Sequence, residues 1–239
     1  MLRAIVLMLA LLLPVAPRAQ SVEEIDVGGA AVRVEMPEGY VRLGKRSPEM
    51  LEAFGRMIPP NNALVEALLA EPDYGRAMIG LPPGEVYYQV QVLRALRETP
   101  VSAADWAQIR PTLLREMGGL QTERLMEEAS AHIRGELETN SGQGARVRMG
   151  DAQTKPVVYG DDPRSVRFWM VLPVELQVGA EVRKRKVVAA AATTVVSKRL
   201  VFLYAFRSLP ENEVADTAAI RATLDAFVER VYRLDAPAK

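Results

Sequence analysis

Apolar residues are most regularly spaced between positions 165 and 207, where three hydrophobic stretches alternate with short polar turns. In the last stretch, from Arg199 to Arg207, successive residues of a β-strand point to opposite faces. Both faces are apolar: one carries Leu200, Phe202, Tyr204 and Phe206, and the other carries Val201, Leu203 and Ala205. Because apolar faces must be covered, the pattern predicts a central strand with a layer on each side of its sheet.

The two preceding stretches predict two more strands, which makes a meander with turns at 178–181 and at Ser197-Lys198. Residues Ala189 to Ala192 are unusually small for a strand and would let a helix approach closely. Further strands are predicted around the Gly28-Gly29 turn, over 85–95, and at 145–149 and 156–159, with a turn at 160–163. The stretch 63–70 fits a helix or a buried strand, and we favour the strand.

Three segments have helical patterns. Ser47-Pro48-Glu49 is a typical helix start for a helix over 47–58. Ser102 and Asp105 resemble a capping box that opens a helical segment at about 102–138, which Pro111 and Gly118-Gly119 would kink or divide. A closing helix is expected over 211–234, with an apolar stripe at Ile220, Leu224, Phe227 and Val231. The predicted fold class is α/β (α+β): one antiparallel-rich sheet with helices on both faces, an α/β/α sandwich over residues 20–239.

The order of these parts resembles a known family. An opening strand runs into Met36-Pro-Glu-Gly-Tyr40, a capped helix and a meander follow, and the chain ends with Leu200-Val-Phe-Leu-Tyr204 before a long helix. This order resembles the Mog1/PsbP-like α/β/α sandwich and small exported bacterial proteins of unknown function. The helical segment at 102–138 is longer than the simplest form of that fold needs. The resemblance implies a binding or assembly role and supplies no catalytic residues.

The first 20 residues have the composition of a secretory signal. Arg3 precedes an apolar run from Ala4 to Leu13, and a turn-forming tail ends at Gln20. We expect cleavage near Ala19, although Pro17 fits the small-residue rule poorly; an uncleaved N-terminal anchor is the alternative. Cleavage would remove Arg3 and Arg18, leaving 28 basic residues (30 − 2) against 30 acidic ones. That balance argues against a nucleic-acid partner. The 239-residue sequence has no Cys, so it forms no disulfide. Because of the secretory signal, the expected location is the periplasm or the outside of the cell.

Signatures of catalysis are weak. His132, the only histidine, lies four residues after Glu128 and near Glu127, which could make a weak metal site or a general base. A solvated helix face is the simpler interpretation, which we favour, and Ser130, two positions from His132, faces elsewhere on the helix. Asp161-Asp162 with Asp151 could hold a hard cation, but a capped turn is the simpler interpretation. Four aromatic residues could line a cleft: Trp106, Trp169, Tyr87 and Tyr88. Their sequence neighbours are mostly apolar, which favours packing in the core. We assign no catalytic, cofactor-binding or metal residues.

The most distinctive surface feature is the basic segment, Arg183, Lys184, Arg185 and Lys186. It could bind an envelope protein, a polyanion or anionic lipid headgroups. The simpler alternative is a solvated hairpin whose charges prevent edge pairing. The sequence therefore predicts a non-enzymatic exported binding or assembly protein. The alternatives are a carboxylate-using hydrolase of an envelope polymer and a peripheral membrane protein that uses the basic hairpin.

Overall fold

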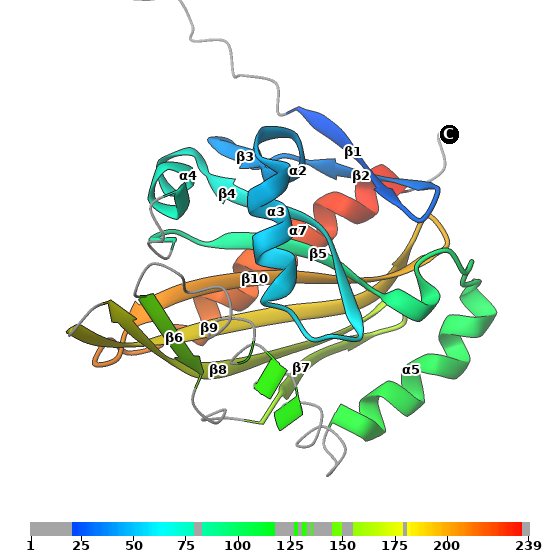
Figure 1. The fold of residues 1–239 in the computed structure, drawn as a ribbon. Helices are drawn as coiled ribbons and strands as arrows, with labels where there is room; N and C mark the ends of the chain where they lie inside the picture. Colours follow the sequence, from blue (N-terminus) through cyan, green and yellow to red (C-terminus); the bar gives the residue numbers. More distant parts are fainter. Residues whose placement is uncertain are drawn as a thin grey trace, which may run out of the picture.

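The computed structural model describes residues 21–78, 83–117, 127–128, 131–132, 135, 145–149, 155–178 and 181–235. Its main element is an eight-stranded sheet in which every pair of neighbouring strands is antiparallel (Figure 1). The order is β3-β4-β5-β10-β9-β8-β6, and β7 also pairs with β8. The strands are β3 (Tyr40–Arg42), β4 (Asn62–Ala70), β5 (Tyr87–Leu93), β6 (Ala145–Met149), β7 (Val157–Asp162), β8 (Ser165–Val178), β9 (Glu181–Val196) and β10 (Arg199–Pro210).

The predicted meander is present as β8, β9 and β10, and β10 is a central strand between β5 and β9. Its two faces have different covers. Val201, Leu203 and Ala205 are fully buried on one face, whereas Phe202, Tyr204 and Phe206 are half-buried on the other. The two-residue turn between β9 and β10 places Ser197 at φ 48° and Lys198 at φ 59°. Positive φ angles at both central residues match the right-handed twist of the flanking strands.

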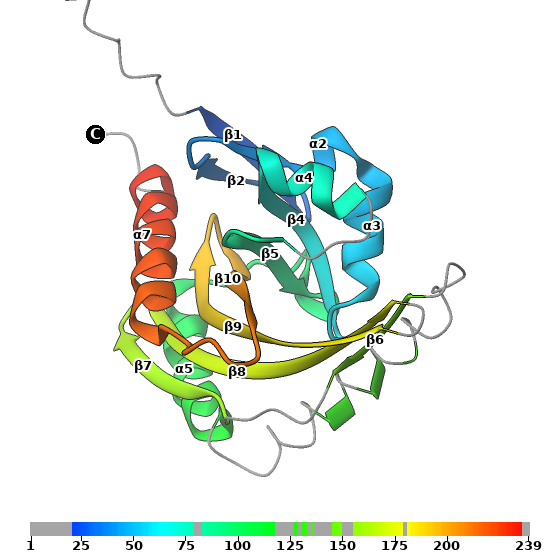
Figure 2. The ribbon, with the colours of Figure 1, turned by 90° about the vertical axis from the view of Figure 1, so that its left-hand side faces the viewer.

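One face of the sheet is covered by α7 (Thr217–Asp235) and by the hairpin of β1 (Val22–Val27) and β2 (Ala30–Glu35). Figure 2 shows α7 on one side of the sheet and α3 on the other. The predicted stripe of α7 is buried: Ile220, Leu224, Phe227 and Val231 are at most 2% exposed. These side chains pack in the same core cluster as Ala190 and Ala192, so the small residues of β9 do admit a helix.

The other face is covered by α3 (Pro48–Arg56), with α2 (Leu43–Arg46) and α4 (Glu71–Met78) beside it, and by α5 (Ala103–Met117). A 3-10 turn, η2 (Arg94–Leu96), follows β5. Trp106 of α5 is 5% exposed and packs with Phe168 and Met170 of β8. The predicted capping box is present, since Ser102 N donates to Asp105 Oδ2 over 2.8 Å and Asp105 N donates to Ser102 Oγ over 3.1 Å. The predicted α/β/α class is therefore confirmed.

Arg42 of β3 links a buried carboxylate of the sheet, Glu66 of β4, to Glu23 of the β1–β2 hairpin. Glu66 is 1% exposed, and Arg42 binds its Oε2 through both Nε and Nη2 at 2.8 Å. Arg42 Nη1 also binds Glu23 Oε2 at 3.0 Å. The second oxygen of Glu66 accepts the backbone N–H groups of Gly44 and Ala67. This carboxylate is thus fully hydrogen-bonded, as burial of a charge requires.

Several boundaries differ from the predictions. The predicted position of the turn at 160–163 is wrong. Strand β7 continues through a bulge to Asp162, and the turn lies at Pro163-Arg164. The closing helix begins at Thr217 and not at 211, since the chain first turns at Pro210, whose carbonyl accepts Glu213 N. The sequence patterns did not predict β3 or α4. Ser47 precedes α3 as predicted, but its side chain makes no capping hydrogen bond.

Candidate functional site

The basic segment lies where β9 extends beyond the end of β10. The register of β9 with β10 ends at the pair Arg185 and Pro210. The register of β9 with β8 continues to Glu181 and Val178. We call Glu181–Lys184 the β9 extension. Among the residues that the structure describes, it is paired on the β8 side only, and it lies on the side of the molecule away from α5 (Figure 1).

The four cations do not form one uniform patch, because Arg185 and Lys186 are half-buried and bind the end of β10 and the turn after it. Arg185 donates from Nε to Ser208 Oγ at 2.8 Å and from Nη2 to the Ser208 carbonyl at 3.1 Å. Lys186 Nζ donates to the Glu211 carbonyl at 2.9 Å. Both side chains are half-buried. They fix β9 to the end of β10 and to the turn that follows it.

The other two cations, Arg183 and Lys184, lie on the β9 extension and are exposed. Lys184 Nζ is 3.8 Å from Glu175 Oε1, an open and long ion pair that contributes little stability. Val182 beside them is 54% exposed. The register of β6 with β8 brings two further arginines to this end of the sheet: Arg148 is opposite Glu175, and Arg146 is opposite Gln177. The exposed Arg183 and Lys184 can attract an acidic partner.

His132 is half-buried on a helical turn, and Glu128 is exposed. In the described parts of the chain, no group of three or more His, Asp or Glu residues could hold a metal ion. The same residues include no helix that is both long and apolar enough to cross a membrane.

Asp162 caps the β7–β8 turn. Its Oδ1 accepts the backbone N–H groups of Arg164 at 2.8 Å and Ser165 at 3.0 Å, and its Oδ2 accepts Ser165 Oγ at 2.8 Å. Burial raises the pKa of this carboxyl, but the hydrogen bonds from Ser165 and Arg164 and the charge of Arg167 outweigh it, so the pKa is lowered overall. Asp162 thus fits the simpler interpretation of a capped turn; Asp151 lies outside the described residues.

Arg167 joins the β7–β8 turn to α7. Its guanidinium is 2.9 Å from Asp225 and 3.2 Å from both Asp162 and Glu229. The hydroxyl of Tyr159 donates to Asp225 at 3.0 Å, and burial raises the pKa of Tyr159. Arg167 forms ion pairs with all three carboxylates, so the cluster attaches the β7–β8 turn to α7.

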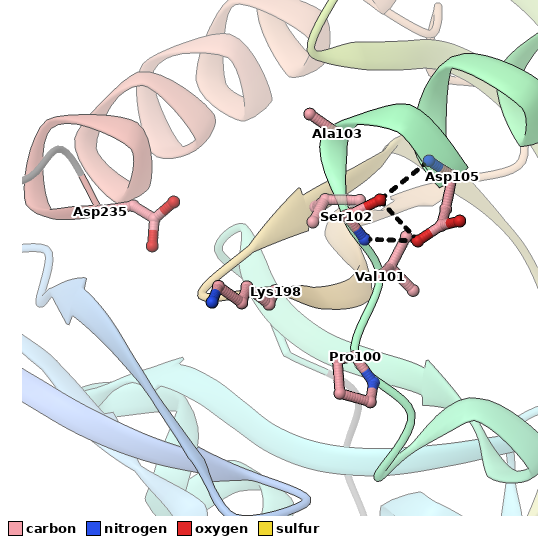
Figure 3. Close-up of a pocket in the computed structure, with 8 residues that line it drawn as sticks. Pro100, Val101, Ser102, Ala103, Asp105, Lys198 and Asp235 are labelled. Atoms are coloured by element: carbon pink, nitrogen blue, oxygen red, sulfur yellow. Dashed lines mark hydrogen bonds between the residues drawn. The ribbon is translucent and has the colours of Figure 1, made fainter.

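A surface depression of about 580 Å³ lies where the β9–β10 turn, the start of α5 and the end of α7 meet (Figure 3). Asp235 lies across it from Ser102 and Asp105. Asp235 Oδ1 accepts the backbone N–H of Ser197 at 2.8 Å, and the capping hydrogen bonds from Ser102 lower the pKa of Asp105. Both carboxylates therefore serve local structure. The lining residues are Pro100, Val101, Ser102, Ala103, Asp105, Val195, Lys198 and Asp235.

The aromatic residues pack within the fold. Trp106 Nε1 donates to the Pro163 carbonyl at 2.9 Å, and Tyr88 is 4% exposed with its ring 4.7 Å from that of Phe227. Tyr87 stacks on Phe206 at 5.0 Å. Burial raises the pKa of Tyr204, in the same row, to about 12.

No protein-family model matches the chain, and no curated protein matches it. A solved structure of the Ran-binding protein Mog1p from Saccharomyces cerevisiae is similar at 12% identity, with 90% of each chain covered and a TM-score of 0.22. Because the TM-score is low, our description of the fold rests on the layers described above.

Proposed function

We propose that this protein is an exported, non-enzymatic binding or assembly protein that contacts an acidic partner through Arg183 and Lys184. The observation that carries the proposal is the register of β9. Its basic residues continue past the last residue of β10, so two cations and Val182 are exposed at the end of the sheet. Exposed charges of one sign steer an oppositely charged partner and accelerate its association.

The anchors at Arg185 and Lys186 support the proposal, since they hold the β9 extension in a defined geometry. A fixed binding strand loses less conformational entropy on association than a flexible one. Asp105 caps α5, Asp162 caps the β7–β8 turn and Asp235 binds the β9–β10 turn, which does not favour the hydrolase alternative. Export through residues 1–19 is part of the proposal. Cell fractionation of the full chain, with mass determination of the mature N-terminus, tests this part separately.

The binding experiment compares two double charge reversals. Arg183→Glu with Lys184→Glu changes the β9 extension. Arg97→Glu with Lys198→Glu makes the same change in net charge at exposed residues near the opposite end of β9. We expect the first variant to bind immobilised polyglutamate at least about tenfold more weakly than the wild type, and the control to remain within about twofold. The difference should shrink as salt screens the charges.

Equal binding by the two variants would show that net charge, and not the β9 extension, attracts the polymer. Absence of binding by the wild type at low salt would also reject the proposal. Circular dichroism should show that both variants retain the folded sheet, because the substituted side chains are exposed.

A further inference from the structure

The end of β10 leaves a place for another strand beside β9. Pro210, the last β10 residue in register, has no backbone N–H group to continue the ladder. Its carbonyl accepts Glu213 N at 3.2 Å, which turns the chain toward α7. The β9 extension therefore continues for four residues with β8 on one side and, among the described residues, no strand on the other.

An open strand edge is a template for pairing, because alternate residues direct their N–H and C=O groups away from the existing neighbour. Around this edge the exposed side chains are Val182, Arg183 and Lys184. Cross-strand pairs of opposite charge, or of apolar residues, stabilise an added strand, whereas like charges opposite each other destabilise it. The side chains thus favour an extended segment that carries acidic residues beside a small apolar one.

We propose that the β9 extension accepts an acidic, extended segment of a partner protein as an added strand, in line with β10. This inference rests on the proposed function and specifies its mode of recognition. Backbone hydrogen bonds along the edge provide affinity, and the side chains provide specificity.

The test uses three peptides with identical charge. The first alternates Glu and Val over about seven residues with blocked ends. The other two carry N-methyl groups on alternate backbone nitrogens, one on each edge of the strand. An added strand pairs through one edge only, so one methylated peptide should bind at least about tenfold more weakly than the other. Amide hydrogen exchange should slow within residues 181–184 when the unmethylated peptide binds.

Equal affinity for the three peptides, with Arg183→Glu/Lys184→Glu still weakening all of them, would overturn strand addition and leave the proposed function intact. Binding of the unmethylated peptide without slower exchange in 181–184 would overturn it too. Failure of the wild-type protein to bind either the peptides or polyglutamate would reject both proposals.

Discussion

Arg185 and Ser208 connect the end of β9 to the end of β10 through two hydrogen bonds, from Nε to Oγ at 2.8 Å and from Nη2 to the backbone carbonyl at 3.1 Å. Because Arg185 is held in this way, the basic segment divides into residues that support the sheet and residues that face outward. Arg185 and Lys186 belong to the first group, and Arg183 and Lys184 belong to the second.

Arg185→Ala should lower the free energy of unfolding by about 1.5 kcal/mol, because it removes charged hydrogen bonds and leaves buried Ser208 without its donor. Lys184→Ala should change it by less than about 0.5 kcal/mol, since its ion pair is long and exposed. Urea denaturation monitored by circular dichroism measures both. Similar losses for the two variants would contradict the division into anchors and exposed cations.

Glu66→Ala should destabilise the protein by about 3–5 kcal/mol, because it leaves the guanidinium of Arg42, whose side chain is 11% exposed, without its buried partner. It also removes the acceptor of Gly44 N and Ala67 N. Glu52→Ala breaks an exposed ion pair with Arg56 and should cost less than about 0.5 kcal/mol. Thermal unfolding of both proteins provides the comparison; a small loss for Glu66→Ala would show that Arg42 tolerates the loss of its buried partner.

Gly28→Ala should be more destabilising than Gly29→Ala. Both glycines have positive φ, at 56° and 80°, which costs alanine about 1–2 kcal/mol. At Gly28 the added Cβ would also lie 2.1 Å from the Arg97 carbonyl oxygen, whereas at Gly29 it meets nothing within 4 Å. Chemical denaturation of the two variants should therefore give unequal midpoints. Equal midpoints would show that the Arg97 backbone moves aside at little cost.

The stability contributed by Asp162 should depend on pH. The folded state lowers the pKa of this carboxyl, so its contribution is present above its unfolded value of about 3.9 and is lost as the pH falls through the lower folded value. Asp162→Asn should therefore reduce stability at pH 7 and reduce it less at pH 3. Urea titrations of the wild type and the variant at the two pH values test this. A loss independent of pH would assign the effect to packing or to hydrogen bonds that asparagine cannot make.

Local sequence patterns predicted the structure correctly where a single local interaction determines it. Gly28-Gly29 provides the positive φ angles of the hairpin turn, and Ser102 with Asp105 forms the predicted capping box. The helix and strand alternatives for 63–70 were resolved by tertiary context, since β4 lies between β3 and β5 and nearly all its residues are buried. The helix α4 was missed: it begins at Glu71-Pro72, and its buried Asp73 accepts the distant backbone N–H groups of Gly84 and Glu85.

The sequence by itself determined that β10 is central, because a strand with two apolar faces is stable only when both are covered. It also determined the meander and the stripe of α7, whose spacing places one apolar face on the sheet. Only the tertiary structure decided which cations are exposed. Arg183 to Lys186 are all basic, so the sequence alone does not distinguish them. Their exposure differs because β10 ends beside Arg185. That end point depends on Pro210, on Ser208 and on a strand register that no local pattern encodes.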